Sequence, residues 1–143
     1  MTITARTASG LMLGELLVHG YDLKGALAQV PSVDANLARL AVGAYAPALA
    51  LMVDPDVARG MTVTFEIRKA AAEPFYLVIE DGVASVAREP TSRGADCRLS
   101  MDPTAFVLTG RIPKWKAVLS GRVRVSGRRP WLAGRMERLL ISV

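Results

Sequence analysis

The sequence predicts an α+β fold, in which helices cover a five-stranded, mostly antiparallel sheet. Two observations predict this class. From Leu11 to Met52 apolar residues recur every three or four positions, which is the spacing of a helix face. After Gly60 the apolar residues alternate, which is the spacing of a strand, and the pair Asp81-Gly82 is typical of a hairpin turn.

The segment before Gly60 predicts two helices. Residues 1–9 are expected to form a loose lead-in, and the first helix covers 11–30. A second helix covers 34–53, with a kink at Pro47, because proline removes one backbone donor. The change of period near residue 60 predicts a boundary between an N-terminal helical segment, 1–59, and a second unit, 60–143.

The segment after Gly60 predicts a four-stranded meander followed by short helices and a fifth strand. The strands are expected at 61–68, 75–79, 83–87, 96–100 and 121–126. Short helices are expected after Asp102, which can cap the first of them, and at 113–119. A closing helix over 130–140 is expected to turn Trp131, Leu132, Met136 and Leu139 inward.

The composition favours a protein that binds an apolar molecule. Of the 143 residues 51% are apolar and only 22% are charged, and the mean hydropathy is +0.28. Such a chain can bury a core and keep apolar surface for a pocket or a subunit contact. The sequence shows no nucleophile–base pair, no phosphate-binding loop and no metal-ligand quartet.

Cysteine usage and hydropathy together predict a cytoplasmic protein. The single cysteine, Cys97, fits a reducing compartment, and no secretory signal is visible. The longest apolar run, 40–53, is shorter than the roughly 20 residues that span a bilayer. Cys97 is not expected to be a catalytic thiol, because the charge of Asp96 beside it would raise its pKa.

Positive charge is concentrated at the C-terminal end of the sequence. Residues 111–143 contain nine lysines and arginines and one acidic residue, Glu137. This pattern favours either a solvated face or attraction to an anionic membrane surface. Nucleic acid is disfavoured as a partner, because no aromatic residues alternate with these charges to stack on bases.

Residues 60–143 resemble the sterol-carrier-protein (type 2) family. The segments that carry the resemblance are Val63-Thr-Phe-Glu-Ile, Asp81-Gly-Val-Ala, Ala95-Asp-Cys-Arg-Leu, Asp102-Pro-Thr-Ala-Phe, Gly110-Arg111, Lys116 through Gly127, and Leu132-Ala. The resemblance implies a five-stranded sheet covered by helices, with an apolar tunnel between the two layers. It also implies that the tunnel binds a lipid, sterol, acyl chain or polyketide.

Eight large apolar side chains are candidates for the lining of that tunnel. They are Phe65, Phe75, Leu77, Phe106, Trp115, Leu119, Trp131 and Met136. The alternative is that they form a solid core, and some of them belong to the core in either case. The flexible thioether of Met136 suits the wall of an irregular cavity.

Residues 11–29 carry a second, shorter resemblance. Gly14-Glu15-Leu-Leu-Val-His19-Gly-Tyr-Asp22-Leu is similar to the last helix of the metal-binding bundle in mycothiol-dependent maleylpyruvate isomerases and other DinB-like proteins. The resemblance implies that Glu15 and His19 are ligands of a divalent metal such as zinc. Catalytic zinc usually has three protein ligands, so a homodimer through the N-terminal helices would have to complete the site. The alternative is a His19 that hydrogen-bonds a neighbour such as Asp22.

Three functions therefore stay open at the level of sequence. The first is a carrier or binding module for an apolar small molecule. The second is an enzyme, either a biosynthetic cyclase or isomerase that folds an apolar substrate in the tunnel, or a truncated metal- and thiol-dependent isomerase or transferase. The third is an interaction subunit whose first helix docks on another protein.

Overall fold

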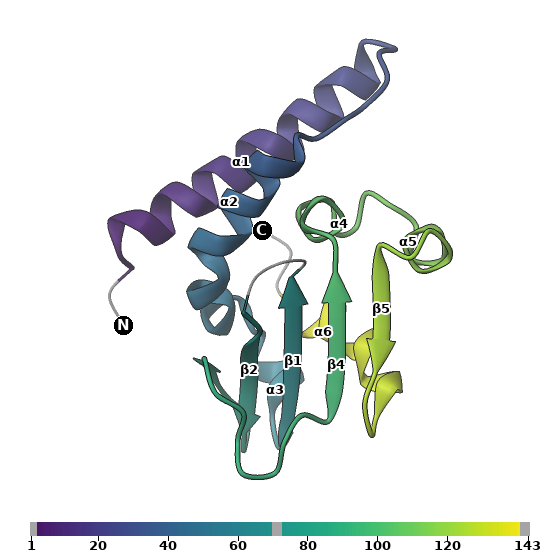
Figure 1. The fold of residues 1–143 in the computed structure, drawn as a ribbon. Helices are drawn as coiled ribbons and strands as arrows, with labels where there is room; N and C mark the ends of the chain where they lie inside the picture. Colours follow the sequence, from purple (N-terminus) through teal and green to yellow (C-terminus); the bar gives the residue numbers. More distant parts are fainter. Residues whose placement is uncertain (1–2, 70–72, 141–143) are drawn as a thin grey trace.

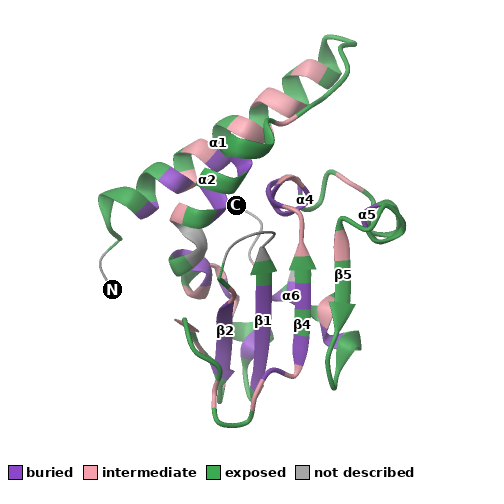
Figure 2. Cartoon of the chain, in the orientation of Figure 1, coloured by how far each residue is buried: buried purple, intermediate pink, exposed green. Residues whose placement is uncertain are grey.

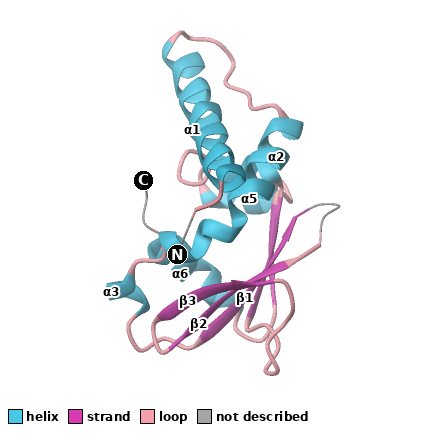
Figure 3. Ribbon diagram, turned by 90° about the vertical axis from the view of Figure 1, so that its left-hand side faces the viewer, coloured by secondary structure: helices cyan, strands magenta, loops and turns pink. Residues whose placement is uncertain are grey.

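The computed structural model describes residues 3–69 and 73–140, and it has the α+β fold that the sequence predicts. A five-stranded sheet forms one layer, and helices pack against one of its faces (Figures 1 and 3). The two N-terminal helices stand side by side and extend away from the sheet.

The sheet is mixed, with three antiparallel pairs and one parallel pair. Its strands are β1 (Val63–Lys69), β2 (Phe75–Glu80), β3 (Val83–Ala87), β4 (Cys97–Met101) and β5 (Val123–Ser126). Their spatial order is β3-β2-β1-β4-β5, and β1 runs parallel to β4. The predicted class and the positions of the five strands are confirmed.

The predicted four-stranded meander is wrong, because β4 pairs with β1 and not with β3. After β3 the loop over 88–96 crosses to the other side of β1. Two hydrogen bonds hold the start of β4 beside β1. The Asp96 carboxylate accepts a hydrogen bond from the backbone N–H of Thr64 at 3.0 Å, and the Asp96 N–H donates to the Thr64 carbonyl at 2.9 Å. The spacing of apolar residues along the sequence does not predict such long-range bonds.

The hairpin predicted at Asp81-Gly82 is confirmed. Asp81 has φ +47° and Gly82 has φ +83°, which is the left-handed conformation that a two-residue hairpin turn requires. An added Cβ at Gly82 would lie 3.2 Å from the backbone of Ala58 and Arg59, so this turn also packs closely on the chain before β1.

The first two helices differ from the prediction at their ends. Helix α1 (Ala5–Ala26) begins six residues earlier than expected, because the Thr4 hydroxyl accepts the N–H of Thr7 at 3.2 Å and caps it. The expected loose lead-in is therefore wrong for the described residues. Helix α2 (Ala35–Tyr45) gives way to the 3₁₀ helix η1 (Ala46–Met52) at Pro47. The disturbance predicted at that proline thus takes the form of a tighter helix.

The remaining helices are short and connect or cover the strands. They are α3 (Pro55–Ala58), α4 (Pro103–Val107), α5 (Lys114–Leu119), the 3₁₀ helix η2 (Pro130–Leu132) and α6 (Ala133–Leu139). The cap predicted at Asp102 is confirmed, since its carboxylate accepts the N–H of Thr104 at 2.9 Å. Of the four side chains predicted to face inward here, Leu132, Met136 and Leu139 are buried, whereas Trp131 is 65% exposed, so the prediction for Trp131 is wrong.

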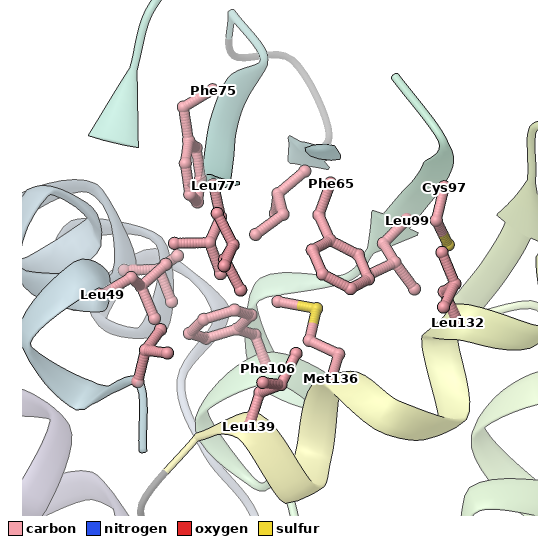
Figure 4. Close-up of a cluster of buried hydrophobic side chains, with 14 of the residues drawn as sticks. Leu49, Phe65, Phe75, Leu77, Cys97, Leu99, Phe106, Leu132, Met136 and Leu139 are labelled. Carbon is pink, nitrogen blue, oxygen red and sulfur yellow. The ribbon is translucent and has the colours of Figure 1, made fainter. Parts of the chain in front are cut away.

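The core lies between the sheet and the helices. Figure 4 shows Phe65, Leu77 and Leu99 of the strands facing Leu49 of η1 and Leu139 of α6. Buried residues of α2 and α3 belong to the same cluster. The division predicted at residue 60 stays a prediction, and the core is continuous across it.

The opposite face of the sheet carries charge. Glu66 is 3% exposed, and its carboxylate accepts hydrogen bonds from Arg68 and, at 2.9 Å, from Arg98. These paired charges make the part of this face around Glu66 unfavourable for an apolar ligand.

Helix α1 is exposed along much of its length (Figure 2). Its packed face, with Thr7, Gly10 and Gly14 buried, lies against α2 and the α4 region. Its solvent face carries Met12, Leu16, Leu23 and Leu27, each at least 60% exposed. We refer to these four residues as the leucine stripe.

Candidate ligand cavity

A cavity of about 460 Å³ lies between β4–β5 and the helices. Leu99 and Met101 of β4 and Val123 and Val125 of β5 form its floor. The odd-numbered residues of both strands face the helices, because successive side chains of a strand point to opposite faces. The pairing of Leu99 with Val125 and of Met101 with Val123 places the four side chains next to one another.

The walls of the cavity come from five segments. Helix α1 contributes Leu11, Gly14 and Val18 to the walls, and η1 contributes Leu49 and Met52. Helix α6 and its neighbours contribute Ala133, Gly134, Met136 and Leu140. The longest continuous part of the lining is the run 105–112, which passes from α4 into the loop before α5; Lys114, Ala117 and Val118 of α5 follow it.

The lining contains few polar side chains, and they lie toward the rim. They are Glu15, Thr109, Arg111 and Lys114. The Thr109 hydroxyl donates to the Phe106 carbonyl at 2.6 Å, so its hydrogen-bonding capacity is used within the protein. Arg111 pairs with Asp22 of α1 at 3.2 Å and ties the α4–α5 loop to the long helix. The site thus combines an apolar interior with a charged rim.

The eight predicted lining residues fall into three groups. Phe106 and Met136 line the cavity. Phe65, Phe75 and Leu77 are buried in the adjoining core and lie outside the lining (Figure 4).

Trp115, Leu119 and Trp131 form the third group, and their side chains are 62%, 79% and 65% exposed. Sequence reasoning missed the run 108–112, because a loop has no periodicity to mark it. Gly110, with φ +85° and open space where a Cβ would lie, is the one local signal there.

Glu15 and His19 lie as a helical i,i+4 pair near the rim. Their side chains are 57% and 73% exposed, and Glu15 Oε2 lies 3.5 Å from His19 Nε2. Within residues 3–69 and 73–140, no group of three or more His, Cys, Asp or Glu side chains is placed to hold a metal. The metal prediction therefore stays a prediction with two ligands per chain.

Cys97 and Asp102 have structural surroundings. Burial raises the pKa of the Cys97 thiol, and the charge of Asp96 raises it further, so the thiol is kept protonated. Burial acts to raise the pKa of Asp102, but hydrogen bonds from Thr104 and Ala105 and the charge of Arg122 outweigh it and hold that pKa below its usual value.

A second hollow of about 570 Å³, the polar groove, lies where β1 begins and β2 ends. Threonine, serine and arginine side chains dominate its lining, which comprises Thr62, Val63, Thr64, Ile79, Glu80, Thr91, Ser92, Arg93, Asp96, Arg128 and Arg129. Asp96 pairs with Arg128 at 3.3 Å. An apolar molecule would displace water from polar groups here and gain little in return.

Comparison with known proteins yields structural neighbours alone, because no protein-family model and no curated protein matches the sequence. The sec-alkylsulfatase Pisa1 from Pseudomonas sp. matches with a TM-score of 0.56 and 23% identity over 66% of this chain. The match covers 15% of that enzyme, so this chain corresponds to a small part of its length. At this identity it shows a shared fold.

Domains of the sterol-carrier type are also among the neighbours. Sterol Carrier Protein 2 Like 2 from Aedes aegypti matches with a TM-score of 0.49 and 17% identity, over 75% of this chain and 100% of its own. The ubiquinone synthesis protein UbiJ-SCP2 matches with a TM-score of 0.44 and 18% identity, over 65% of this chain and 74% of its own.

Among the helices of the described residues, none is long and apolar enough to cross a membrane.

Proposed function

We propose that this protein binds an apolar or amphiphilic small molecule in the cavity between β4–β5 and the helices. The observation that carries the proposal is the lining: aliphatic, aromatic and thioether side chains enclose about 460 Å³, with charge at the rim alone. Ligand pockets in proteins commonly have volumes of about 300–1,000 Å³ and linings of this kind. The resemblance to the sterol-carrier family implies the same class of ligand.

The energy of binding would come from apolar area removed from water. Each methylene group transferred from water to such a lining contributes about 0.8 kcal/mol, which is about fourfold in affinity. Apolar contacts discriminate weakly between similar shapes, so the length and width of the cavity would set the selectivity. The protein would act by partition, taking up whichever apolar molecule fits.

A series of fatty acids tests this proposal. Saturated acids from octanoate to hexadecanoate are titrated against a bound fluorescent acyl probe. Affinity is expected to rise about fourfold per added methylene and to level off where the chain fills the cavity. A flat series, or no displacement at any length, would contradict the proposal.

Homodimer formation through the N-terminal helices is a second proposal, and the leucine stripe supports it. Leu16 and Leu23 lie seven residues apart on one face of α1, a spacing that helical dimers use. Such an apolar stripe in water favours association. Arg6 and Lys24 on one flank of the stripe are opposite in charge to Glu15 on the other flank, which favours pairing with a second copy. Sedimentation of wild type against Leu16→Ser/Leu23→Ser tests it, and a wild-type monomer at all concentrations would contradict it.

Metal binding at Glu15 and His19 depends on such a dimer, because two copies would supply four ligands. Zinc is then expected to raise the melting temperature, and His19→Ala is expected to abolish that rise. An unchanged melting temperature in the presence of zinc would contradict metal binding, and the proposal of an apolar ligand cavity would stand.

A further inference from the structure

The geometry points to α5 as a membrane-docking element that places the rim of the cavity against an anionic lipid surface. This six-residue helix, Lys114–Leu119, exposes Trp115, Val118 and Leu119, at 62%, 54% and 79%. Its Ala117 is 8% exposed and faces the cavity. The helix therefore exposes its large apolar side chains and buries its smallest one, Ala117.

The three exposed side chains form one ridge. At 3.6 residues per turn, positions 115, 118 and 119 lie within about 100° of one another on the helix surface. Lys114 and Lys116 lie on the two flanks of this ridge, about 100° to either side of Trp115. Lys116 Nζ is 5.5 Å from the centre of a Trp115 ring, so the cation and the aromatic side chain occupy the same surface.

The segment that carries the ridge has charge of one sign. Residues 111–124 contain Arg111, Lys114, Lys116, Arg122 and Arg124 and no acidic residue, and of these Arg111 is paired with Asp22 of α1. An apolar stripe flanked by lysines is the pattern of a helix that lies in a membrane interface, where the apolar side chains enter the acyl boundary. The lysine stems can lie along that boundary while their ammonium groups reach anionic headgroups.

The position of the ridge links docking to the cavity. Lys114, Ala117 and Val118 line the cavity, so the helix that carries the ridge is also part of the cavity wall. A tryptophan at 62% exposure is suited to the headgroup region, because its ring is apolar and its N–H needs a polar partner. The inference that an apolar ligand passes between the membrane and the rim rests on the proposed function, and the docking itself does not.

Vesicle binding tests the docking. In a Trp131→Phe background Trp115 is the sole tryptophan, since the sequence contains two. With phosphatidylcholine vesicles that contain about 30% phosphatidylserine, we expect co-sedimentation, a blue shift of Trp115 emission and quenching by brominated acyl chains. Binding is expected to weaken at about 1 M salt, where charges more than about 3 Å apart are screened.

Two matched variants assign the surface. In otherwise native protein, Trp115→Ser/Leu119→Ser is expected to weaken vesicle binding about tenfold or more. Leu40→Ser/Val83→Ser, outside the ridge, the cavity lining and the leucine stripe, is the control pair and is expected to leave it unchanged. Both pairs are exposed, and thermal melting checks that each variant folds.

The docking is overturned if the vesicles leave Trp115 emission unchanged or if the control pair Leu40→Ser/Val83→Ser alone loses binding. It is also overturned if Trp115→Ser/Leu119→Ser abolishes self-association seen without lipid, because the ridge would then be covered by a second copy. Probe displacement without vesicles reports on the cavity by itself, so its success beside failed vesicle binding would overturn the docking and leave the proposed function standing.

Discussion

The apolar cavity and the polar groove differ less in size than in what surrounds them. Their volumes are about 460 and 570 Å³, and both open to solvent beside the same sheet. The cavity has a floor of aliphatic strand residues and walls of helices, whereas threonines and arginines border the groove. Volume alone therefore does not identify a site for an apolar ligand, because displacing water from apolar walls is favourable, whereas displacing it from polar walls costs free energy.

Stability is the property in which the cavity and the groove are expected to differ most. Phe106→Ala, in the cavity wall, is expected to lower the free energy of unfolding by about 3 kcal/mol, because it removes a buried aromatic side chain from the core. Thr91→Ala, in the groove, is expected to cost less than about 1 kcal/mol, since its hydroxyl bonds are long and its side chain is half-buried. Urea unfolding of both variants measures the difference. Equal losses would contradict the distinction.

The next effect is on ligand binding. Ala117→Phe places a ring in the cavity and is expected to weaken binding of the acyl probe about tenfold or more, because the ring occupies the volume of the ligand. Ser92→Phe adds the same ring to the groove and is expected to leave probe binding unchanged. Probe titration compares them, and Ala133→Leu, on the α6 wall, is a milder block should Ala117→Phe lower the melting temperature.

Other outcomes for the Ala117→Phe and Ser92→Phe variants would contradict the assignment of the ligand to the cavity. If Ser92→Phe weakens the probe and Ala117→Phe does not, the ligand lies in the groove. If neither does, the probe binds at the surface, and the cavity is not its site.

The smallest effect concerns the cap of α4, the helix that begins the cavity wall. Asp102→Ala is expected to cost about 1 kcal/mol at neutral pH, because the N–H groups of Thr104 and Ala105 lose their acceptor. Since the pKa of Asp102 is lowered by folding, its contribution is present above the unfolded value near 4 and is lost as the pH falls through the lower folded value. The difference between wild type and variant should therefore shrink as the pH falls below about 4. A difference that grows on acidification would contradict this account.

The parts of the fold that the sequence predicts are those with local causes. Asp81-Gly82 needs left-handed backbone, Asp102 caps the two N–H groups that follow it, and the alternation after Gly60 follows from one buried strand face. The pairing of β4 with β1 was not predictable in this way, because it depends on bonds between Asp96 and Thr64, 32 residues apart.

The apolar character of the candidate site was predictable from the sequence, but many of the residues that line it were not. Phe106 and Met136 lie on helices whose spacing marks an inner face, and both line the cavity. Helix α5 has apolar residues on most of its surface, so the sequence could not tell that Trp115 faces water and Ala117 faces the cavity. The loop 108–112 contributes to the lining through its position after α4, and its residues have no periodicity that would predict this.

A map of protein–ligand contacts by nuclear Overhauser effects tests directly whether the apolar cavity holds the ligand. The protein is labelled with carbon-13 and the ligand, dodecanoate, is left unlabelled. Contacts are expected from the acyl chain to the side chains of Leu99, Val123 and Met136. Contacts to Thr62 and Thr91 in the groove, or no contact with the cavity lining at saturating ligand, would contradict it.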